Sequence, residues 1–245
     1  MTTNPWQVQI QGYASDLEHL TGHLSSTMRR VLRDEHGVGF LYESSAFATC
    51  NQAQEVLAVA NEELRVLSGV LKVTRDSPEP LSTGAVFKKN AAGGRDVFVF
   101  IVDGVQARCE LGEIVVADSN GSVIAGPTRP SKTTTVAQLA LGDAAVGKVM
   151  RLLAAPDCNS WVGMYRIYEV IEADIGGQHK LEKAGWGAAK DLDRFKHSAN
   201  SVTVAGDSAR HGKEKARPPA NPMSLDEADA YLWHLLRSWL SSKGI

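Results

Sequence analysis

The feature that most constrains the fold is a change in character along the chain at Gly126–Pro130, which reads Gly-Pro-Thr-Arg-Pro. Before this point, short runs rich in β-branched and aromatic residues alternate with turns, whereas beyond it apolar residues recur at helical spacing. Its prolines and glycine favour a linker. We therefore predict an α+β protein with two domains: a mixed α/β domain with antiparallel strands over residues 1–126, and an all-α helical bundle over residues 134–245.

The N-terminal domain opens with alternating apolar and polar side chains over Trp6–Gln11, which predicts a half-buried strand. Ser15 is followed by Glu18 at the spacing of a capping box, so a short helix is expected to begin there. The next expected elements are a strand at Gly39–Glu43 and a helix from Asn51 to Leu67 that stops at Gly69.

After Gly69 the chain is expected to be rich in strands, because short runs of β-branched and aromatic residues are separated by turn residues. These runs cover residues 71–73, 85–89, 97–102 and 112–118. Asp103-Gly104 is a hairpin signal between two of them. The run at 97–102 is apolar on both faces, which predicts a central strand rather than an edge strand.

The C-terminal half shows helical spacing of apolar residues in four segments. Ser224 and Glu227 form a capping box before the last of these. The four segments are 134–154, a second that begins at Asn159 or Ser160 and ends at Gly176-Gly177, 188–200, and the segment after Ser224. A long polar connection from Ser201 to Met223 joins the last two.

Composition excludes some protein classes. No apolar run approaches the ~20 residues that span a bilayer, and the N-terminal residues lack the pattern of a secretory signal. The three cysteines, Cys50, Cys109 and Cys158, are odd in number and far apart, which favours a reducing compartment. We therefore expect a cytoplasmic protein with no membrane association.

Charge is distributed unevenly. The chain has a net charge of −2, yet residues 180–217 hold nine Lys or Arg against five Asp or Glu. A basic segment on an acidic molecule is attractive to RNA or to another polyanion, although a solvated surface loop has the same composition.

The basic segment contains two adjacent side chains suited to RNA chemistry, Arg210 and His211. Histidine acts as an acid or base near neutral pH, and arginine binds phosphate oxygens bidentately. A ribonuclease that uses the 2′-hydroxyl of its substrate needs few other groups and no metal. We predict His197 and Asn200 as further members of the catalytic set. The predicted nucleic-acid-binding residues are Arg194, Lys196, Lys213, Lys215, Arg217 and Trp186, the last by stacking on a base.

A structural interpretation of the same residues stays open. Arg210 and His211 would then cap helix ends or pair with Asp193 or Asp207, and Trp186 would pack against the bundle. His19 and His23 are four residues apart on the first predicted helix, a spacing that suits two metal ligands. No third ligand is evident, so we expect a solvated helix face, and neither a metal nor a cofactor.

A helical bundle with a polar Arg/His segment before its final helix resembles the HEPN superfamily, whose members are common in prokaryotic toxins and antiviral defence. The residues that carry this resemblance are Ala199-Asn200-Ser201 and Ala205–Gly212, within 134–245. It implies metal-independent RNA cleavage in a dimer that brings two copies of the motif together. The family motif separates its Arg and His by several residues, whereas here they are adjacent. Either the chemistry is built differently, or the chain is a non-catalytic relative.

Two functions follow as expectations. The first is an RNA-directed protein of a bacterial toxin or antiviral-defence system, acting as an endoribonuclease through Arg210 and His211. The second is a non-catalytic interaction or scaffold protein whose helical half dimerises or docks a protein partner. A third possibility is a small-molecule sensor, in which the N-terminal domain binds a ligand and shifts the helical half.

Overall fold

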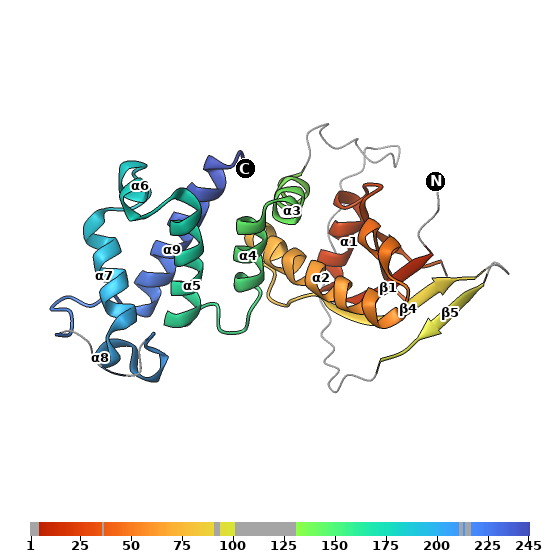
Figure 1. Ribbon diagram of the computed structural model, residues 1–245, viewed down its shortest axis with the longest axis horizontal. Coiled ribbons are helices and arrows are strands. Elements are labelled where there is room, and N and C mark those ends of the chain that lie inside the picture. Colours follow the sequence, from red (N-terminus) through yellow and green to blue (C-terminus); the bar gives the residue numbers. More distant parts are fainter. Residues whose placement is uncertain (1–4, 36, 91–93, 101–130, 211–212, 214–216) are drawn as a thin grey trace, which may run out of the picture. The chain divides into compact units, whose positions relative to one another are not determined.

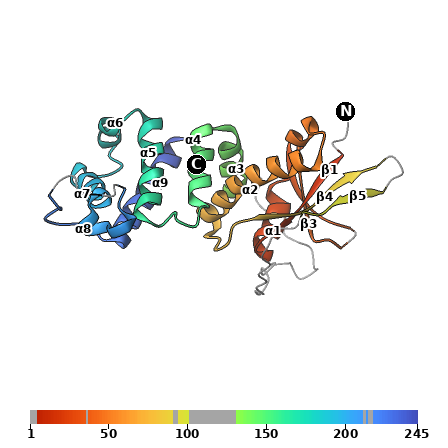
Figure 2. The same cartoon turned by 60° about the horizontal axis from the view of Figure 1, so that its bottom comes forward.

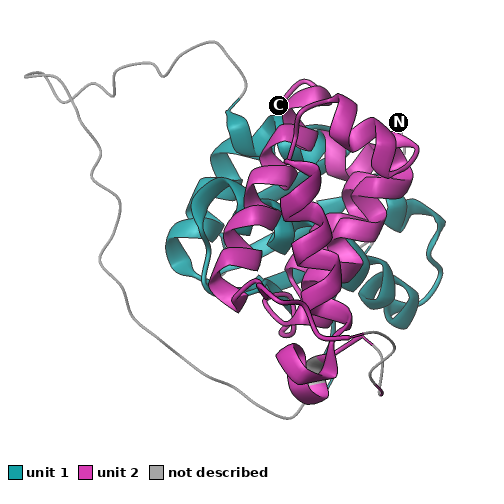
Figure 3. Cartoon of the chain, turned by 90° about the vertical axis from the view of Figure 1, so that its left-hand side faces the viewer, with its two compact units in different colours: residues 1–138 teal, residues 139–245 magenta. Residues whose placement is uncertain are grey.

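The computed structural model describes residues 5–35, 37–90, 94–100, 131–210, 213 and 217–245 (Figure 1). It confirms the α+β class, with an antiparallel sheet in the N-terminal half and helices in the C-terminal half. The chain divides into two compact units, residues 1–138 and 139–245, coloured teal and magenta in Figure 3. We call them the N-terminal unit and the helical unit. The predicted linker at 126–130 lies outside the described residues.

The sheet of the N-terminal unit has the strand order β2-β3-β1-β4-β5, and every neighbouring pair is antiparallel (Figure 2). Its strands are β1 (Trp6–Gln11), β2 (Arg29–Arg33), β3 (Phe40–Ser44), β4 (Ser82–Lys89) and β5 (Arg95–Phe98). Helix α1 (Ala14–His23) connects β1 to β2, and α2 (Ala53–Arg75) connects β3 to β4. Because β3 lies between β1 and β2, the arrangement is a split β-α-β. The predicted strand at Trp6–Gln11 is confirmed, whereas β2 was not predicted.

A row of buried side chains crosses the sheet on the face that α1 and α2 cover. Val8 pairs with Tyr42 and Val86, and Tyr42 pairs with Val31, so the four lie on one face. On α2, Glu63 accepts a hydrogen bond from the Tyr42 hydroxyl at 2.9 Å. Burial, reinforced by the Glu63 charge, raises the pKa of Tyr42 well above its ordinary value. The alternation of apolar residues along these strands therefore builds the core beneath the two helices.

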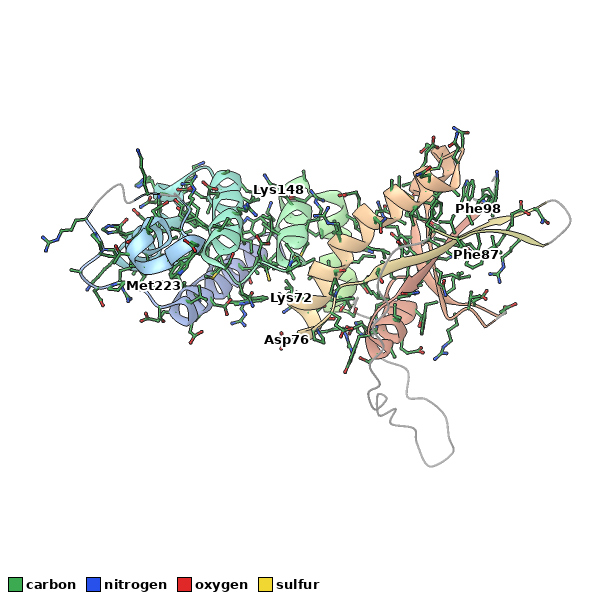
Figure 4. All side chains as sticks on the ribbon, turned by 90° about the horizontal axis from the view of Figure 1, so that it is seen from below. Lys72, Asp76, Phe87, Phe98, Lys148 and Met223 are labelled. Carbon is green, nitrogen blue, oxygen red and sulfur yellow. The ribbon has the colours of Figure 1, made fainter. Side chains whose placement is uncertain are left out.

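Two predictions at the end of α2 are wrong. Gly69 does not stop the helix, and residues 71–73 are helical rather than a strand. Helix α2 continues to Arg75 and ends at Asp76, which adopts the left-handed conformation at φ 56° (Asp76 is labelled in Figure 4). Val66, Leu67, Val70 and Leu71 are buried on either side of the glycine. Their burial outweighs the cost of about 1 kcal/mol that a glycine imposes within a helix.

The position of β5 also differs from the prediction. The run at 97–102 was expected to form a central strand, yet β5 is the edge of the described sheet, and Val97 is 56% exposed. Because β4 occupies the place beside β1, the hairpin that follows it puts β5 on the outside. Phe87 on β4 and Phe98 on β5 are labelled in Figure 4. The predicted turn at Asp103-Gly104 and the run at 112–118 lie outside the described residues.

The first helix of the N-terminal unit does not use the predicted capping box. Helix α1 begins after Tyr13, and Tyr13 makes no side-chain cap. His19 and His23 stack with ring centroids 3.9 Å apart, and His19 Nε2 lies 2.8 Å from Thr133 Oγ1. Within the described part of the chain, no three metal-ligating side chains gather at one place.

Seven helices are described beyond the linker, and α3 spans the boundary between the two units. They are α3 (Lys132–Gly142), α4 (Ala144–Leu153), α5 (Trp161–Ile175), α6 (Gln178–Lys183), α7 (Ala189–Asn200), α8 (Val202–Ala205) and α9 (Leu225–Ser242). The single helix predicted at 134–154 is wrong, because Asp143 caps a new helix by accepting hydrogen bonds from the N–H groups of Ala145 and Val146. None of the described helices is long and apolar enough to cross a bilayer.

Local signals at other helix ends are confirmed. Ser160 caps α5 and Gly176 ends it at φ 90°, as the sequence indicated. Ser224 and Glu227 form both hydrogen bonds of the predicted capping box of α9. The short helices α6 and α8 were not predicted.

Aromatic packing holds the centre of the helical unit. The fully buried ring of Phe195 on α7 lies 5.7–6.3 Å from four other rings. These belong to Trp161, Tyr165 and Tyr168 of α5 and to Tyr231 of α9. Such ring pairs add stability beyond the area they bury, so they fix α7 against α5 and α9.

Candidate nucleic-acid interface

The polar connection between α7 and α9 is held to the surface of α7 at several points. The backbone N–H of Arg210 donates to the carbonyl of Ala199 at 3.0 Å. Farther along, the backbone N–H of Met223 donates to Ser198 Oγ at 2.8 Å, and Met223 is buried. The polar connection is therefore held to α7 at both of these points.

Arg194, predicted to bind nucleic acid, is occupied by contacts within the chain. Its guanidinium donates to the carbonyls of Asn221 and Pro222 at 3.3 and 3.2 Å. It also lies 3.4 Å from Glu227, the carboxylate of the α9 capping box. Hydrogen bonding from the Ser224 backbone, with help from Arg194, lowers the pKa of Glu227. Arg194 thus fastens the end of the polar connection and the start of α9 to α7.

Lys196 is also tied within the helical unit. Its Nζ donates to Gln178 Oε1 at 2.9 Å and lies 3.9 Å from Glu172. It lies over the Tyr168 ring, 5.6 Å from the centroid. These contacts join α7 to α5 and α6, so the charge is largely compensated before any phosphate arrives.

Of the predicted catalytic residues, His197 is exposed and its Nε2 donates to the Arg217 carbonyl at 2.8 Å. A carbonyl only accepts, so this contact places a proton on Nε2. Asn200 donates its amide N–H to the Lys196 carbonyl at 2.7 Å, while its Oδ1 is buried and has no hydrogen-bond partner among the described residues. His197 therefore holds the basic segment, and Asn200 continues the last turn of α7.

Arg210 differs from these residues. Its Nη2 lies 2.6 Å from Glu169 Oε1, and its guanidinium carbon lies 4.5 Å from the centre of the Tyr165 ring. The side chain nevertheless keeps 39% of its surface exposed. A guanidinium with five donors is not saturated by one carboxylate contact, so Arg210 keeps donors for an external acceptor. Two side chains of α5 orient it.

The other residues that were predicted to act on RNA have no ordered partner set like that of Arg210 among the described residues, or lie outside those residues. Lys213 and Arg217 are exposed, whereas His211 and Lys215 lie outside the described residues. Trp186 is half-buried in the turn between α6 and α7, where Gly187 packs against the Tyr231 hydroxyl. Burial, followed by the charges of Asp191, Asp193 and Glu182, raises the pKa of Tyr231 to about 12. These carboxylates act on Tyr231, whose hydroxyl lies against the turn, so they oppose a phosphate backbone beside Trp186.

A groove in the helical unit adjoins Arg210. It has a volume of about 640 Å³. Its lining comes from α4 and α5, and we call it the α4–α5 groove: Ala144, Ala145, Lys148, Leu152, Arg166, Glu169, Val170, Ala173 and Asp174. Glu169 belongs both to this lining and to the Arg210 pair, so Arg210 contacts one residue of the groove.

Sequence reasoning missed Tyr165 and Glu169, which position Arg210. They are four residues apart on α5 and therefore share a face of that helix. In the sequence, Tyr165 recurs at helical spacing with the apolar residues around it, and nothing local pairs Glu169 with an arginine 41 residues away. The sequence does show an aromatic residue and an acid four positions apart on one helix, but this spacing does not indicate that Arg210 is the residue they contact.

No family model matches the chain, and no curated protein or solved structure matches it either.

Proposed function

We propose that the protein is an RNA-directed protein of the toxin or antiviral-defence type, and that its helical unit holds the RNA backbone through Arg210. One observation carries the proposal: Glu169 and Tyr165 orient the Arg210 guanidinium while 39% of the side chain stays exposed. Protein groups that fix the direction of a charged side chain lower the entropy lost on ligand binding. Arg194 and Lys196 lack this accessibility, because their donors are engaged within the chain.

The contact with RNA would use the donors of Arg210 that do not face Glu169. Arginine presents a planar fork that matches two phosphate oxygens, and the Tyr165 face restricts the plane of that fork. A phosphate oxygen carries more charge than a neutral acceptor, so the hydrogen bonds are charge-assisted. Lys213 and Arg217, both exposed on the same connection, add positive charge along the backbone.

The cleavage step of the proposal adds His211, whose role rests on the sequence alone. In this step the 2′-oxygen bonds to phosphorus while the bond from phosphorus to the 5′-oxygen breaks. His211 takes the proton of the 2′-hydroxyl and returns a proton to the departing 5′-oxygen. Arg210 stabilises the charge that develops on the pentacoordinate phosphorus.

A second candidate, a non-catalytic interaction protein, is favoured by a different observation. Three of the predicted functional residues, Arg194, Lys196 and His197, hold the helices and the basic segment together. A fold that uses its basic residues as internal fasteners suits a scaffold that dimerises or docks a protein partner.

The deciding experiment incubates the full chain with a mixed tRNA and mRNA pool in EDTA, and measures both cleavage and retention of RNA on a filter. The variants are Arg210→Ala and His211→Ala. The control is Arg237→Ala, an exposed arginine of α9 that lies 5.9 Å from the centre of the Trp233 ring and so has a comparable aromatic contact.

We expect wild type and Arg237→Ala to bind and cleave, His211→Ala to bind without cleaving, and Arg210→Ala to lose about tenfold or more in affinity. Binding without cleavage by wild type would remove the nuclease and keep the RNA function. Absence of RNA binding by folded wild type would move the conclusion to the interaction protein.

A further inference from the structure

The α4–α5 groove combines an apolar floor with charged edges. Ala144, Ala145 and Leu152 of α4 face Val170 and Ala173 of α5 across it. Small side chains on both helices let a flat ring approach the floor closely. The volume of about 640 Å³ falls within the range of small-ligand sites, roughly 300–1,000 Å³.

The two carboxylates of the groove are already compensated. Glu169 pairs with Arg210 at 2.6 Å, and Asp174 pairs with Lys243 at 3.0 Å. Asp174 also accepts a hydrogen bond from Trp239 Nε1 at 2.8 Å. These contacts turn both carboxylates toward cations of the helical unit, although Lys243 is shared with Asp143 at 2.8 Å.

The two cations that line the groove, Lys148 and Arg166, are less compensated by neighbouring charges than its two carboxylates are. Arg166 pairs with Asp157 at 3.3 Å, but more than half of each side chain is exposed, so the pair is weak. Lys148 on α4 is exposed and is labelled in Figure 4. An occupant of this groove therefore meets an apolar floor and two accessible cations, Lys148 and Arg166, which are complementary to an apolar body with one anionic group.

We infer that the α4–α5 groove binds one nucleotide of the RNA, with the base on the apolar floor and its phosphate at Lys148 and Arg166. This inference rests on the proposed function, because it places that nucleotide beside the phosphate held by Arg210. The link between the two is Glu169, which lines the groove and orients Arg210. Aliphatic side chains accept the flat face of any base, so the groove would not distinguish strongly between bases.

The test measures binding of AMP and of adenosine to the full chain by isothermal titration calorimetry. We expect AMP to bind and adenosine to bind about tenfold more weakly, because adenosine lacks the phosphate that the two cations contact. The double variant Lys148→Gln/Arg166→Gln should bind AMP about as weakly as wild type binds adenosine. Its control is Lys190→Gln, at an exposed cation of α7 that does not line the groove.

A second pair of variants tests the floor. Ala144 and Ala189 are both exposed first residues of helices, α4 and α7, and only Ala144 lines the groove. Ala144→Phe should fill the groove and abolish AMP binding, whereas Ala189→Phe should bind AMP as wild type does. Circular dichroism establishes that both variants keep their helices.

A flat AMP titration with wild type would overturn the inference, and so would groove variants that bind AMP as well as their controls. Either result leaves the proposed function in place if the Arg210→Ala variant still binds RNA more weakly than wild type does. Conversely, absence of RNA binding by wild type refutes the proposed function whatever AMP does. Binding of an acidic helical peptide in place of AMP would make the groove a protein-docking site and would also overturn the inference.

Discussion

Replacing Arg194 separates its structural use from the predicted contact with RNA. We choose Arg194→Met, because methionine keeps an unbranched stem of similar packing while it removes all donors. The variant loses two hydrogen bonds to the carbonyls of Asn221 and Pro222, at 3.3 and 3.2 Å. These two bonds hold the end of the polar connection against α7.

The magnitude follows from the geometry. Hydrogen bonds to charged groups contribute about 1.5–3 kcal/mol each, but these two are long, and the arginine side chain is 21% exposed. We therefore assign about 1 kcal/mol to each and expect a loss of about 2 kcal/mol in the free energy of unfolding. The ion pairs of Arg194 with Asp191 and Glu227 are left out of this value because both acids are solvent-accessible.

The assay is urea unfolding followed by tryptophan fluorescence, which reports mainly on the helical unit because four of the five tryptophans lie there. Arg237→Met is the control, and it should stay within about 0.5 kcal/mol of wild type. RNA affinity, measured on folded protein, should be unchanged by Arg194→Met and lowered by Arg210→Ala. A stable Arg194→Met variant that loses RNA binding would refute this reasoning and restore Arg194 as a phosphate ligand.

Three further predictions concern stability. Glu63→Leu leaves Arg29 and the buried Tyr42 hydroxyl without their acceptor and should cost about 3 kcal/mol in urea unfolding; an unchanged midpoint would show that the cluster contributes nothing. Phe195→Ala should cost about 4 kcal/mol by the same assay, and a loss under about 1 kcal/mol would contradict the aromatic centre. Lys243→Met should cost about 1–2 kcal/mol at pH 7. Hydrogen bonding from Lys243 lowers the pKa of Asp143 below its ordinary value of 3.8. Burial alone would lower the pKa of Lys243, but hydrogen bonds to Asp143 and Asp174 raise it above its ordinary value of 10.5. The difference in the free energy of unfolding between Lys243→Met and wild type should therefore be constant between pH 3.8 and 10.5, and should shrink below pH 3.8 or above pH 10.5. A difference that changes steadily across neutral pH would contradict the assignment of these ion pairs.

Elements specified by adjacent residues were predictable from the sequence. The alternation over Trp6–Gln11 needs only a half-buried surface, and the capping box of Ser224 and Glu227 is satisfied within four residues. The change in spacing of apolar residues at residue 126 likewise indicated the α+β class. Apolar residues recur every second position in a half-buried strand and every three to four positions in a helix, so the two kinds of structure can be told apart along the chain.

Elements that depend on competing signals were not predictable. Gly69 resembles a helix stop, but burial of Val66 and Val70 carries α2 past it. Asp143 resembles a helix-interior residue, yet it caps α4 and its carboxylate meets Lys243 at 2.8 Å. Burial of the two valines needs the packed core, and the contact of Asp143 with Lys243 joins residues 100 positions apart, so neither can be read from neighbouring residues.

The sequence by itself determined the fold class and the presence of a basic segment that contains Arg210 and His211. Only the tertiary structure decided which of those charges is free to act. Arg194 reaches Glu227 across 33 residues, and Arg210 reaches Glu169 across 41. Periodicity describes neighbours within a few residues, so it cannot distinguish an arginine that fastens two helices from one that is oriented and left exposed.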